Sequence, residues 1–331
     1  MKNALFYFVY TLLLLFPCLE IALRIVQYQP YHYTPFQISS TPEFCLLPHP
    51  RLGFALNPGQ YEVTINHGLT YSVTHSQDSL RISRVEESEA SLPILALFGC
   101  SYTYGIGLPD SLSYGYVLQS ILSEYEIQTL AVPGYGTVQS YLQLLKMINN
   151  GRPPSIAVMH FADFHHDRNA LTPLFRQTLH MGFERSHQHI PQLMRSSKVP
   201  YMTEDSIGWE DWSQVYHNWP GREKWPSVHF LQEVADQIGL HQLDSHSKSC
   251  QIFFMIHRLC QLHNIRLIVA GITSNQPTQQ TLDSLTANGI ETLDMSLDLT
   301  NTLYNNYPFD THPNAIAHLH FAVNMKRYLS L

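Results

Sequence analysis

Five short apolar runs that alternate with helical stretches constrain the fold of this chain more than any other feature. The runs are PILALF (93–98), IQTLAV (127–132), SIAVMHF (155–161), IRLIVAGI (265–272) and IETLDM (290–295). Apolar residues recur at helical spacing near 112–123, 138–149, 248–263, 278–287 and 314–329. Continuous apolar runs are typical of strands that are buried on both faces. The sequence therefore predicts an α/β fold, with a parallel sheet covered by helices on both faces.

The composition describes a folded chain and excludes two classes of protein. The 331 residues are 44% hydrophobic and only 14% charged, with a formal net charge of −7. Because binding to nucleic acid rests on clustered positive charge, this acidic chain without a Lys/Arg run is not expected to bind it. The 5 Cys residues form no CxxC pair, so neither a disulfide framework nor a cysteine-rich zinc site is indicated.

The amino terminus carries a membrane or export signal. Residues 4–19 contain no charge, after Lys2 and before Glu20 and Arg24. A spanning helix needs roughly 20 apolar residues, which this run reaches only if Glu20 lies near the interface. A cleaved signal peptide is the alternative, but small residues for cleavage are limited to Ala22. We expect residues 1–27 to be an uncleaved transmembrane anchor, with the body in the periplasm or outside the cell.

Three further segments complete the expected organisation. Residues 28–90 combine a Pro-rich neck (28–50) with a small hairpin, YEVTI (61–65) and TYSVT (70–74), around a turn at 66–68. Residues 91–331 form the main domain. Within it, residues 165–246 separate the third strand from the next helix, which is far longer than a usual crossover and indicates an insertion. All 4 Trp residues fall in this insertion, either as its own small core or as platforms for sugar rings.

Polar residues follow the predicted strands, at the edge where open parallel sheets bind ligands. GCSYTYG (99–105) is a glycine-flanked turn that would lift Ser101 to this edge as a nucleophile. PGYG (133–136) and ADFHHDRN (162–169) follow the next two strands. Before the last helix, His312 could act as a base that Asp310 orients.

The ordered set of these segments resembles the SGNH, or GDSL, hydrolases over residues 92–330. The first block of that family, G-D-S followed by T and G, is similar to residues 99–105, its second-block glycine to Gly134, and its last block to DTHPN (310–314). The resemblance implies a three-layer flavodoxin-like fold with Ser101 as nucleophile, His312 as general base and Asp310 as its orienting carboxylate. It also implies an oxyanion hole that includes the N–H groups of Ser101 and Gly134. The anchor, neck and short β segment resemble the membrane-anchored bacterial members.

Two departures from the family pattern bear on activity. Cys100 replaces the usual Asp before the nucleophile, and the third block, G-x-N-D, has no clear counterpart. By position, Asp163 stands where the oxyanion-hole Asn belongs, and Asn169 lies six residues further on. An ionised Asp163 would repel the oxyanion, so it would have to be protonated, turned away or replaced in this role by Asn169 or a His. Losing one oxyanion donor costs on the order of a hundred- to a thousandfold in rate.

The expected function is that of a serine esterase or deacylase on an acylated glycan or lipid of the cell envelope, with a membrane contact through the amino terminus. The alternatives are an inactive domain that binds glycan or a partner protein, and an O-acyltransferase. No nucleotide cofactor is expected, because neither a P-loop nor GxGxxG occurs. No metal site is expected either. The histidine pairs at 165–166, 187–189 and 318–320 lack the spacing of a catalytic zinc site.

Overall fold

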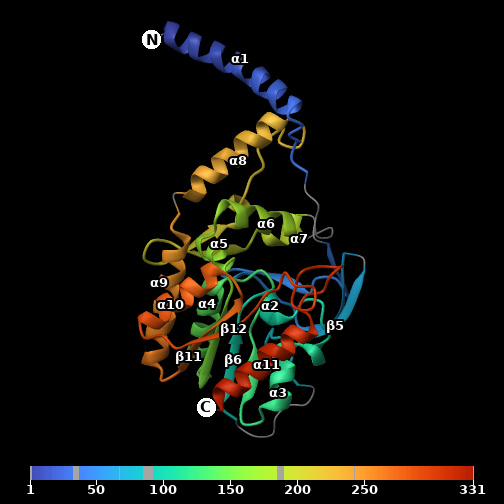
Figure 1. The fold of residues 1–331 in the computed structure, drawn as a ribbon, viewed down its shortest axis with the longest axis vertical. Helices are drawn as coiled ribbons and strands as arrows, with labels where there is room; N and C mark the ends of the chain where they lie inside the picture. Colours follow the sequence, from blue (N-terminus) through green and yellow to red (C-terminus); the bar gives the residue numbers. More distant parts are fainter. Residues whose placement is uncertain are drawn as a thin grey trace.

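A five-stranded parallel sheet forms the centre of the molecule (Figure 1). The computed structural model describes residues 2–32, 37–66, 68–84, 92–184, 190–241 and 243–330. The strands are β6 (Ile94–Phe98), β7 (Glu126–Thr129), β8 (Ile156–Phe161), β11 (Arg266–Thr273) and β12 (Thr292–Leu297), in the spatial order β12-β11-β8-β6-β7. All neighbouring pairs are parallel. The prediction of an α/β fold with a central parallel sheet is confirmed.

Two helical layers cover this sheet because successive side chains of each strand point to opposite faces. Leu95 and Leu97 of β6 belong to one apolar cluster, whereas Ala96 and Phe98 belong to another. The first cluster includes α3 (Tyr114–Ile121) and α11 (Ala315–Leu329). The second includes α4 (Thr137–Asn149), α9 (Ser245–Leu262) and α10 (Gln276–Ala287). Each face of the sheet is thereby closed to solvent, which explains the uninterrupted apolar runs of its strands.

A small β segment precedes the main domain. β4 (Gly59–Ile65) and β5 (Leu69–His75) form the expected antiparallel hairpin, and His67 of its turn lies outside the described residues. The stretch 28–50, expected to be only a linker, contributes β1 (Ile38–Thr41) to this sheet and β2 (Leu46–His49) to a second hairpin with β3 (Gly53–Leu56). Both strands have four residues, which is too short to produce a recognisable alternation.

The long insertion covers the carboxyl edge of the sheet. It contains α5 (His165–Ala170), α6 (Pro173–Glu184), α7 (Ile190–Met194), β9 (Lys198–Met202), β10 (Ile207–Asp211), the 3-10 turn η2 (Trp212–Gln214) and α8 (Pro226–His241). Phe175 of α6 and Trp212 of η2 join an apolar cluster with Phe54 of the β segment. Trp212 therefore belongs to a core, whereas Trp209, Trp219 and Trp225 are 37%, 43% and 47% exposed.

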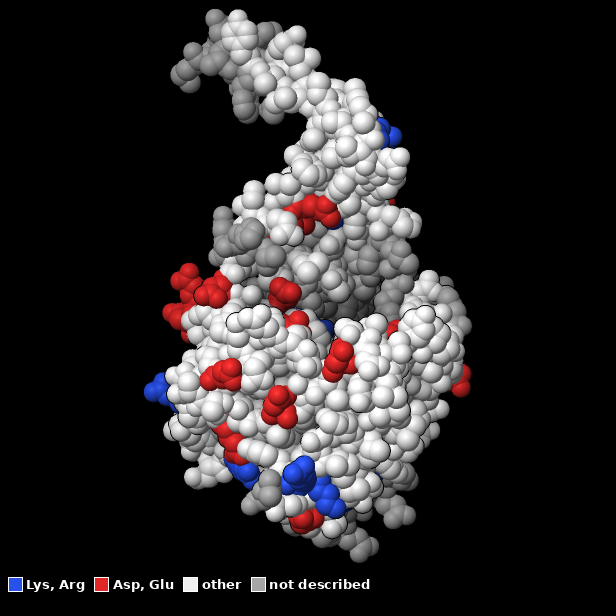
Figure 2. All heavy atoms as spheres, in the orientation of Figure 1, with Lys and Arg blue, Asp and Glu red and all other residues white. Residues whose placement is uncertain are grey.

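Helix α1 (Lys2–Ile25) projects from the body beside α8 (Figure 1). The Ser227 N–H donates to Glu20 Oε2 over 2.9 Å and joins the two helices, while Arg24 pairs with Glu20 Oε1 at 2.7 Å. Beyond this contact, Leu15 and Ile21 are more than half exposed. In Figure 2 the described surface of the projecting α1 is white except for a blue group near the body. Among the described residues, no helix combines the length and the apolar character that crossing a bilayer requires.

Buried histidines predict acid sensitivity. Burial lowers the pKa of His160 on β8 to about 4 and that of His318 on α11 to about 3. Both folded pKa values lie below the value of about 6.5 in an unfolded chain. Their stabilisation is therefore complete above pH 6.5 and is lost as the pH falls towards 4 and 3. The free energy of unfolding should drop by about 3 kcal/mol for each histidine, as urea melts from pH 7 to 4 would measure.

His318→Asn is the matched variant for this pH series. His318 Nδ1 accepts the Tyr114 N–H over 2.8 Å, and an asparagine oxygen can accept the same bond without titrating. The variant should show a shallower loss of stability with acid than the wild type. Equal slopes, or an unfolding free energy that is constant from pH 7 to 4, would contradict the assignment.

Candidate active site

Ser101 lies at the carboxyl edge of the sheet, directly after strand β6. It is the first residue of the short helix α2 (Ser101–Tyr104), which ends at Gly105 in the left-handed region, with φ +91°. The strand packs closely here, because a Cβ built on Gly99 would lie 2.4 Å from Thr103 Oγ1. Glycine at 99 therefore lets the chain turn sharply between strand and helix. Ser101 remains 5% exposed.

Asp310 and His312 form a pair in the loop before α11. His312 Nδ1 lies 2.9 Å from Asp310 Oδ2, and the His312 backbone N–H donates to Asp310 Oδ1 over 3.0 Å. The carboxylate is almost buried, with its side chain 4% exposed, whereas the imidazole is 18% exposed. Two bonds from one carboxylate fix both the orientation of the ring and the tautomer with its proton on Nδ1. This arrangement suits a general base that acts through Nε2.

The loop of His312 packs against the serine turn. The rings of Tyr102 and His312 meet edge to face, with their centroids 5.4 Å apart. The Asn306 side chain donates to the Ile106 carbonyl over 3.1 Å, and the Asn306 N–H donates to the His312 carbonyl over 3.0 Å. The structure thus brings Ser101, Asp310 and His312 to one edge of the sheet.

Two backbone N–H groups at this edge are open to a ligand. Gly134 follows β7 in a turn with φ +87°, and a Cβ there would lie 3.0 Å from Phe54 Cζ. Within the described ranges, neither the Gly134 N–H nor the Ser101 N–H donates to a protein acceptor. Both groups are therefore available to stabilise a negative oxygen, as an oxyanion hole requires.

Asp163 and Asn169 do not complete this hole as open amide donors. Asp163 is a carboxylate, and its Oδ1 accepts the Thr273 hydroxyl over 3.2 Å. Asn169 is fully buried, and its Oδ1 accepts the N–H groups of Thr137 at 2.7 Å and Val138 at 3.3 Å. Its Nδ2 donates to hydroxyl groups of Thr137 and Ser249. Asn169 Oδ1 thus caps the first turn of α4, and Nδ2 is occupied by the two hydroxyl groups.

Arg168 lies beside the serine turn, and no sequence motif marks it. Its Nη1 donates to the Tyr135 carbonyl over 2.8 Å, and its guanidinium lies over the Phe164 ring, 4.3 Å from the centroid. Burial lowers the pKa of Arg168, whereas the side chains of Cys100, Tyr102 and Asp167 act in the opposite direction. The only sequence signal for it is a lone Arg in the polar stretch that follows a buried strand.

Tyr102 and Cys100 complete the surroundings of the serine. Burial raises the pKa of Tyr102 to about 12; Cys100, Asp163 and Asp310 add to the shift, and Arg168 opposes it. Tyr102 therefore stays a neutral phenol at physiological pH. Cys100 is completely buried, which does not suit a rival nucleophile.

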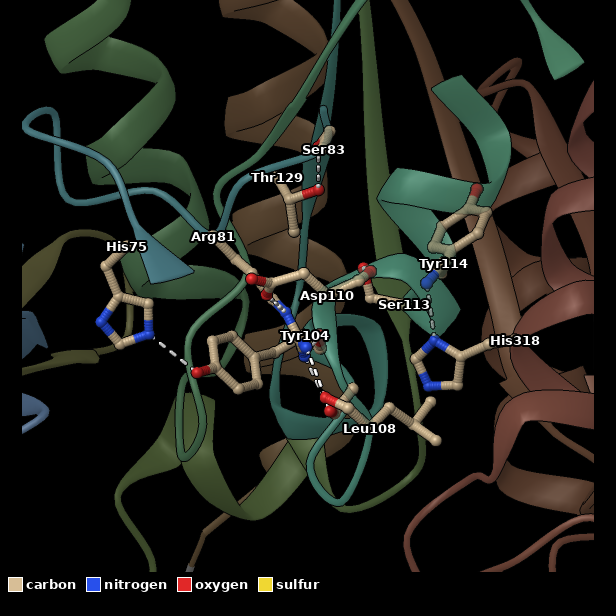
Figure 3. A network of polar contacts seen from close by, with 11 residues as sticks. His75, Arg81, Ser83, Tyr104, Leu108, Asp110, Ser113, Tyr114, Thr129 and His318 are labelled. Atoms are coloured by element: carbon tan, nitrogen blue, oxygen red, sulfur yellow. Dashed lines mark hydrogen bonds and ion pairs between the residues drawn. The ribbon is translucent and has the colours of Figure 1, made fainter. Parts of the chain in front are cut away.

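A buried arginine, Arg81, donates hydrogen bonds to carbonyls at the end of the serine turn and in the loop after it (Figure 3). Arg81, 1% exposed, donates through Nη1 to the carbonyls of Tyr104 at 2.6 Å and Gly105 at 2.7 Å, and through Nη2 to that of Leu108 at 2.5 Å. Its Nε lies 3.2 Å from Asp110 Oδ1, at the start of the 3-10 turn η1 (Asp110–Leu112). Arg81, which follows the β segment, thereby fixes the loop between α2 and η1.

A groove of about 580 Å³ lies on the far side of this loop. Its walls come from β5, from the loop before α3 and from the residues around the start of α11: Leu69, Thr70, Tyr71, Ser72, Gly107, Leu108, Pro109, Leu112, Asn306, Asn314, Ala315 and Ile316. Ser101, Gly134 and His312 do not line it, so the chemistry is not assigned to this groove.

Comparisons with known proteins add the following. No protein-family model matches the chain, and no curated protein sequence matches it. Similar solved structures include a protein described as a lipolytic protein of the G-D-S-L family from Desulfitobacterium hafniense, at 9% identity and TM-score 0.38, covering 71% of this chain and 98% of that one. They also include the psychrotrophic esterase EstA from Pseudoalteromonas sp., at 9% identity and TM-score 0.39, covering 72% and 99%. Similarity at this level assigns neither a family nor an activity to this chain.

Proposed function

We propose that this chain is a serine esterase whose nucleophile is Ser101. The observation that carries the proposal is the Asp310–His312 pair, with 2.9 Å between Oδ2 and Nδ1, in a loop that packs against the serine turn. A serine on a sharp strand-to-helix turn, an oriented imidazole and two open N–H groups are the parts that acyl transfer needs.

Each of these groups has one role in the proposed reaction. Ser101 Oγ bonds to the carbonyl carbon of an ester while its proton passes to His312 Nε2. The Asp310 carboxylate stabilises the resulting imidazolium through Nδ1. When the tetrahedral intermediate collapses, the bond to the leaving oxygen breaks, and the alcohol takes the proton from His312. Water then attacks the acyl-serine by the same route, which releases the acid and restores Ser101.

The proposal predicts that Ser101 reacts with a serine-directed phosphonate. Wild-type protein incubated with a fluorophosphonate should carry the phosphonyl group on the peptide that contains Ser101. His312→Ala should react much more slowly, because the hydroxyl then lacks its base. Peptide mass spectrometry measures both. Labelling of other serines, or none in folded wild-type protein, would contradict the proposal.

A non-catalytic binding domain is the second candidate function. One observation favours it: the amide of Asn169 is occupied by hydrogen bonds within the protein and is not an open donor. Such a domain would leave Ser101 unreactive towards the phosphonate while still binding an acylated glycan. The labelling experiment therefore separates the two functions.

We also propose that the chain acts at the cell envelope, attached to a membrane through α1, on an acylated glycan or lipid. The support is the projecting helix α1, on which Leu15, Ile21 and Ile25 are 57%, 59% and 75% exposed. Exposed apolar side chains grouped in this way mark a surface that another apolar phase covers. Release of the whole protein from membranes by alkaline carbonate without detergent would argue against attachment.

A further inference from the structure

The proposed oxyanion hole has one unexplained feature, which is its charge. Asp163 follows the third strand of the sheet, and its carboxylate raises the pKa of Tyr102, which is adjacent to Ser101. The next residue, Phe164, meets the Tyr102 ring edge to face, with centroids 5.1 Å apart, so Asp163 lies near the serine turn. A carboxylate near the site also disfavours a negative oxygen on the intermediate. The amide of Asn169, which could have supplied a donor, is occupied in the α4 cap. The site therefore needs another group to offset the negative charge.

Arg168 lies beside both halves of the proposed hole. Its Nη1 donates to the carbonyl of Tyr135, the residue after Gly134. On the other side it interacts with the side chain of Cys100, the residue before Ser101. Arg168 thus contacts the residue after Gly134 and the residue before Ser101, the two residues whose N–H groups are open.

The charge of Arg168 is not neutralised by an ion pair. Among the described residues, no carboxylate oxygen lies within 4.0 Å of its guanidinium, whereas Arg81 and Arg176 both have such a partner. Its contacts are a carbonyl, a cysteine side chain and the faces of Phe164 and Phe175, 4.3 Å and 5.7 Å from the ring centroids. The Asp167 carboxylate favours this charge from beyond ion-pair distance. A largely buried cation whose charge is only partly offset is costly in a folded protein, and such groups concentrate where function uses them.

We propose that the guanidinium of Arg168 stabilises the negative oxygen of the tetrahedral intermediate, together with the N–H groups of Ser101 and Gly134. Arg168 supplies here the donor that Asn169 does not, and its positive charge offsets Asp163. The attraction between a preorganised cation and the oxygen grows as negative charge develops on that oxygen. Arg168 therefore stabilises the transition state more than it strengthens substrate binding. This inference rests on the proposed esterase function.

The test compares Arg168→Met and Arg168→Lys with the wild-type full chain, using p-nitrophenyl acetate. Arg168→Met keeps the length but removes the charge, and should lower kcat by about a hundredfold with KM changed by less than about threefold. Arg168→Lys keeps the charge and should lose about tenfold at most in kcat. Arg152→Met is the control, because the Arg152 side chain is 59% exposed. Its contact with a carboxylate is long, at 3.9 Å, and that carboxylate is exposed as well.

A second readout excludes a purely structural role. A boronic acid forms a tetrahedral anion on a reactive serine. Its inhibition constant should therefore rise in Arg168→Met by the same factor by which kcat/KM falls. If Arg168 only anchored the Tyr135 carbonyl, the thermal midpoint of Arg168→Met would fall. The losses in boronic acid affinity and in kcat/KM would then not be equal. The proposal is overturned if Arg168→Met keeps more than half of kcat, or if Arg168→Lys loses as much as Arg168→Met.

Failure of this inference differs from failure of the esterase proposal. If the wild type is no faster than Ser101→Ala and does not bind the boronic acid, the esterase function and the role of Arg168 fall together. If the wild type exceeds Ser101→Ala and Arg168→Met matches the wild type, only the role of Arg168 falls.

Discussion

Ser101→Ala is expected to lower kcat/KM for p-nitrophenyl acetate by at least about a thousandfold, since the covalent route then lacks its nucleophile. The side chain of Ser101 is 5% exposed on a turn that Gly99 and Gly105 permit, so alanine should fit without rearrangement. The thermal midpoint should therefore stay close to that of the wild type. Steady-state kinetics and a thermal melt on the same preparation measure the two effects.

The companion variants show whether Ser101 works with Asp310 and His312. His312→Ala should cost about as much as Ser101→Ala, and the double variant little more, because groups that act as one unit are not additive. Asp310→Asn should also cost several orders of magnitude, since an amide stabilises the wrong tautomer of His312. Ser120→Ala is the matched control, because Ser120 is exposed and bonds only to the Val117 carbonyl of its own helix. Additive losses would show that the three residues do not act as a unit.

Arg81→Met is expected to lower the free energy of unfolding by about 3–5 kcal/mol, which is the cost of breaking a buried ion pair by removing one partner. The loss includes the pair with Asp110 at 3.2 Å and the three carbonyls of the serine loop, which then stay buried without a donor. Because these carbonyls belong to the loop behind Ser101, the variant should also lower kcat at temperatures where it is still folded.

The control for Arg81 is again an exposed arginine. Arg152→Met removes the same chemical group from a site that is 59% exposed, and surface substitutions usually change stability by less than about 0.5 kcal/mol. Urea unfolding monitored by tryptophan fluorescence measures both variants. A loss below about 1 kcal/mol for Arg81→Met would show that the network in Figure 3 contributes little.

Much of the main domain could be predicted because burial leaves a direct trace in the sequence. The run at 93–98 is apolar at every position since β6 is covered on both faces, and the inner strands β8 and β11 are almost entirely buried as well. The runs of the edge strands β7 and β12 include polar residues, and these strands are less buried. The turn around Ser101 was recognisable from its flanking glycines, and Asp310 and His312 from their spacing of two. Strand β7 ends at Thr129, three residues before the predicted end, although the N–H groups of Leu130 and Val132 still donate to the carbonyls of Leu97 and Gly99.

The features that could not be predicted depend on contacts between distant segments. Asn169 and Arg168 are adjacent, yet one is a buried helix cap and the other borders the serine turn, and no local pattern distinguishes these roles. Arg81 is a lone arginine after a hairpin, and its role depends on carbonyls more than 20 residues away in the chain. Likewise the sequence of β1 predicts only a linker, because β1 is a strand only through its pairing with β4.

The measurement that tests the account most directly is the intact mass of the protein during turnover. Wild-type protein quenched in acid while it hydrolyses p-nitrophenyl acetate should carry the mass of one acetyl group, on the peptide that contains Ser101. Ser101→Ala should carry none, and Asp310→Asn should accumulate it more slowly. Acetyl groups spread over other side chains, or hydrolysis without any acetyl group on Ser101, would contradict a covalent route through this serine.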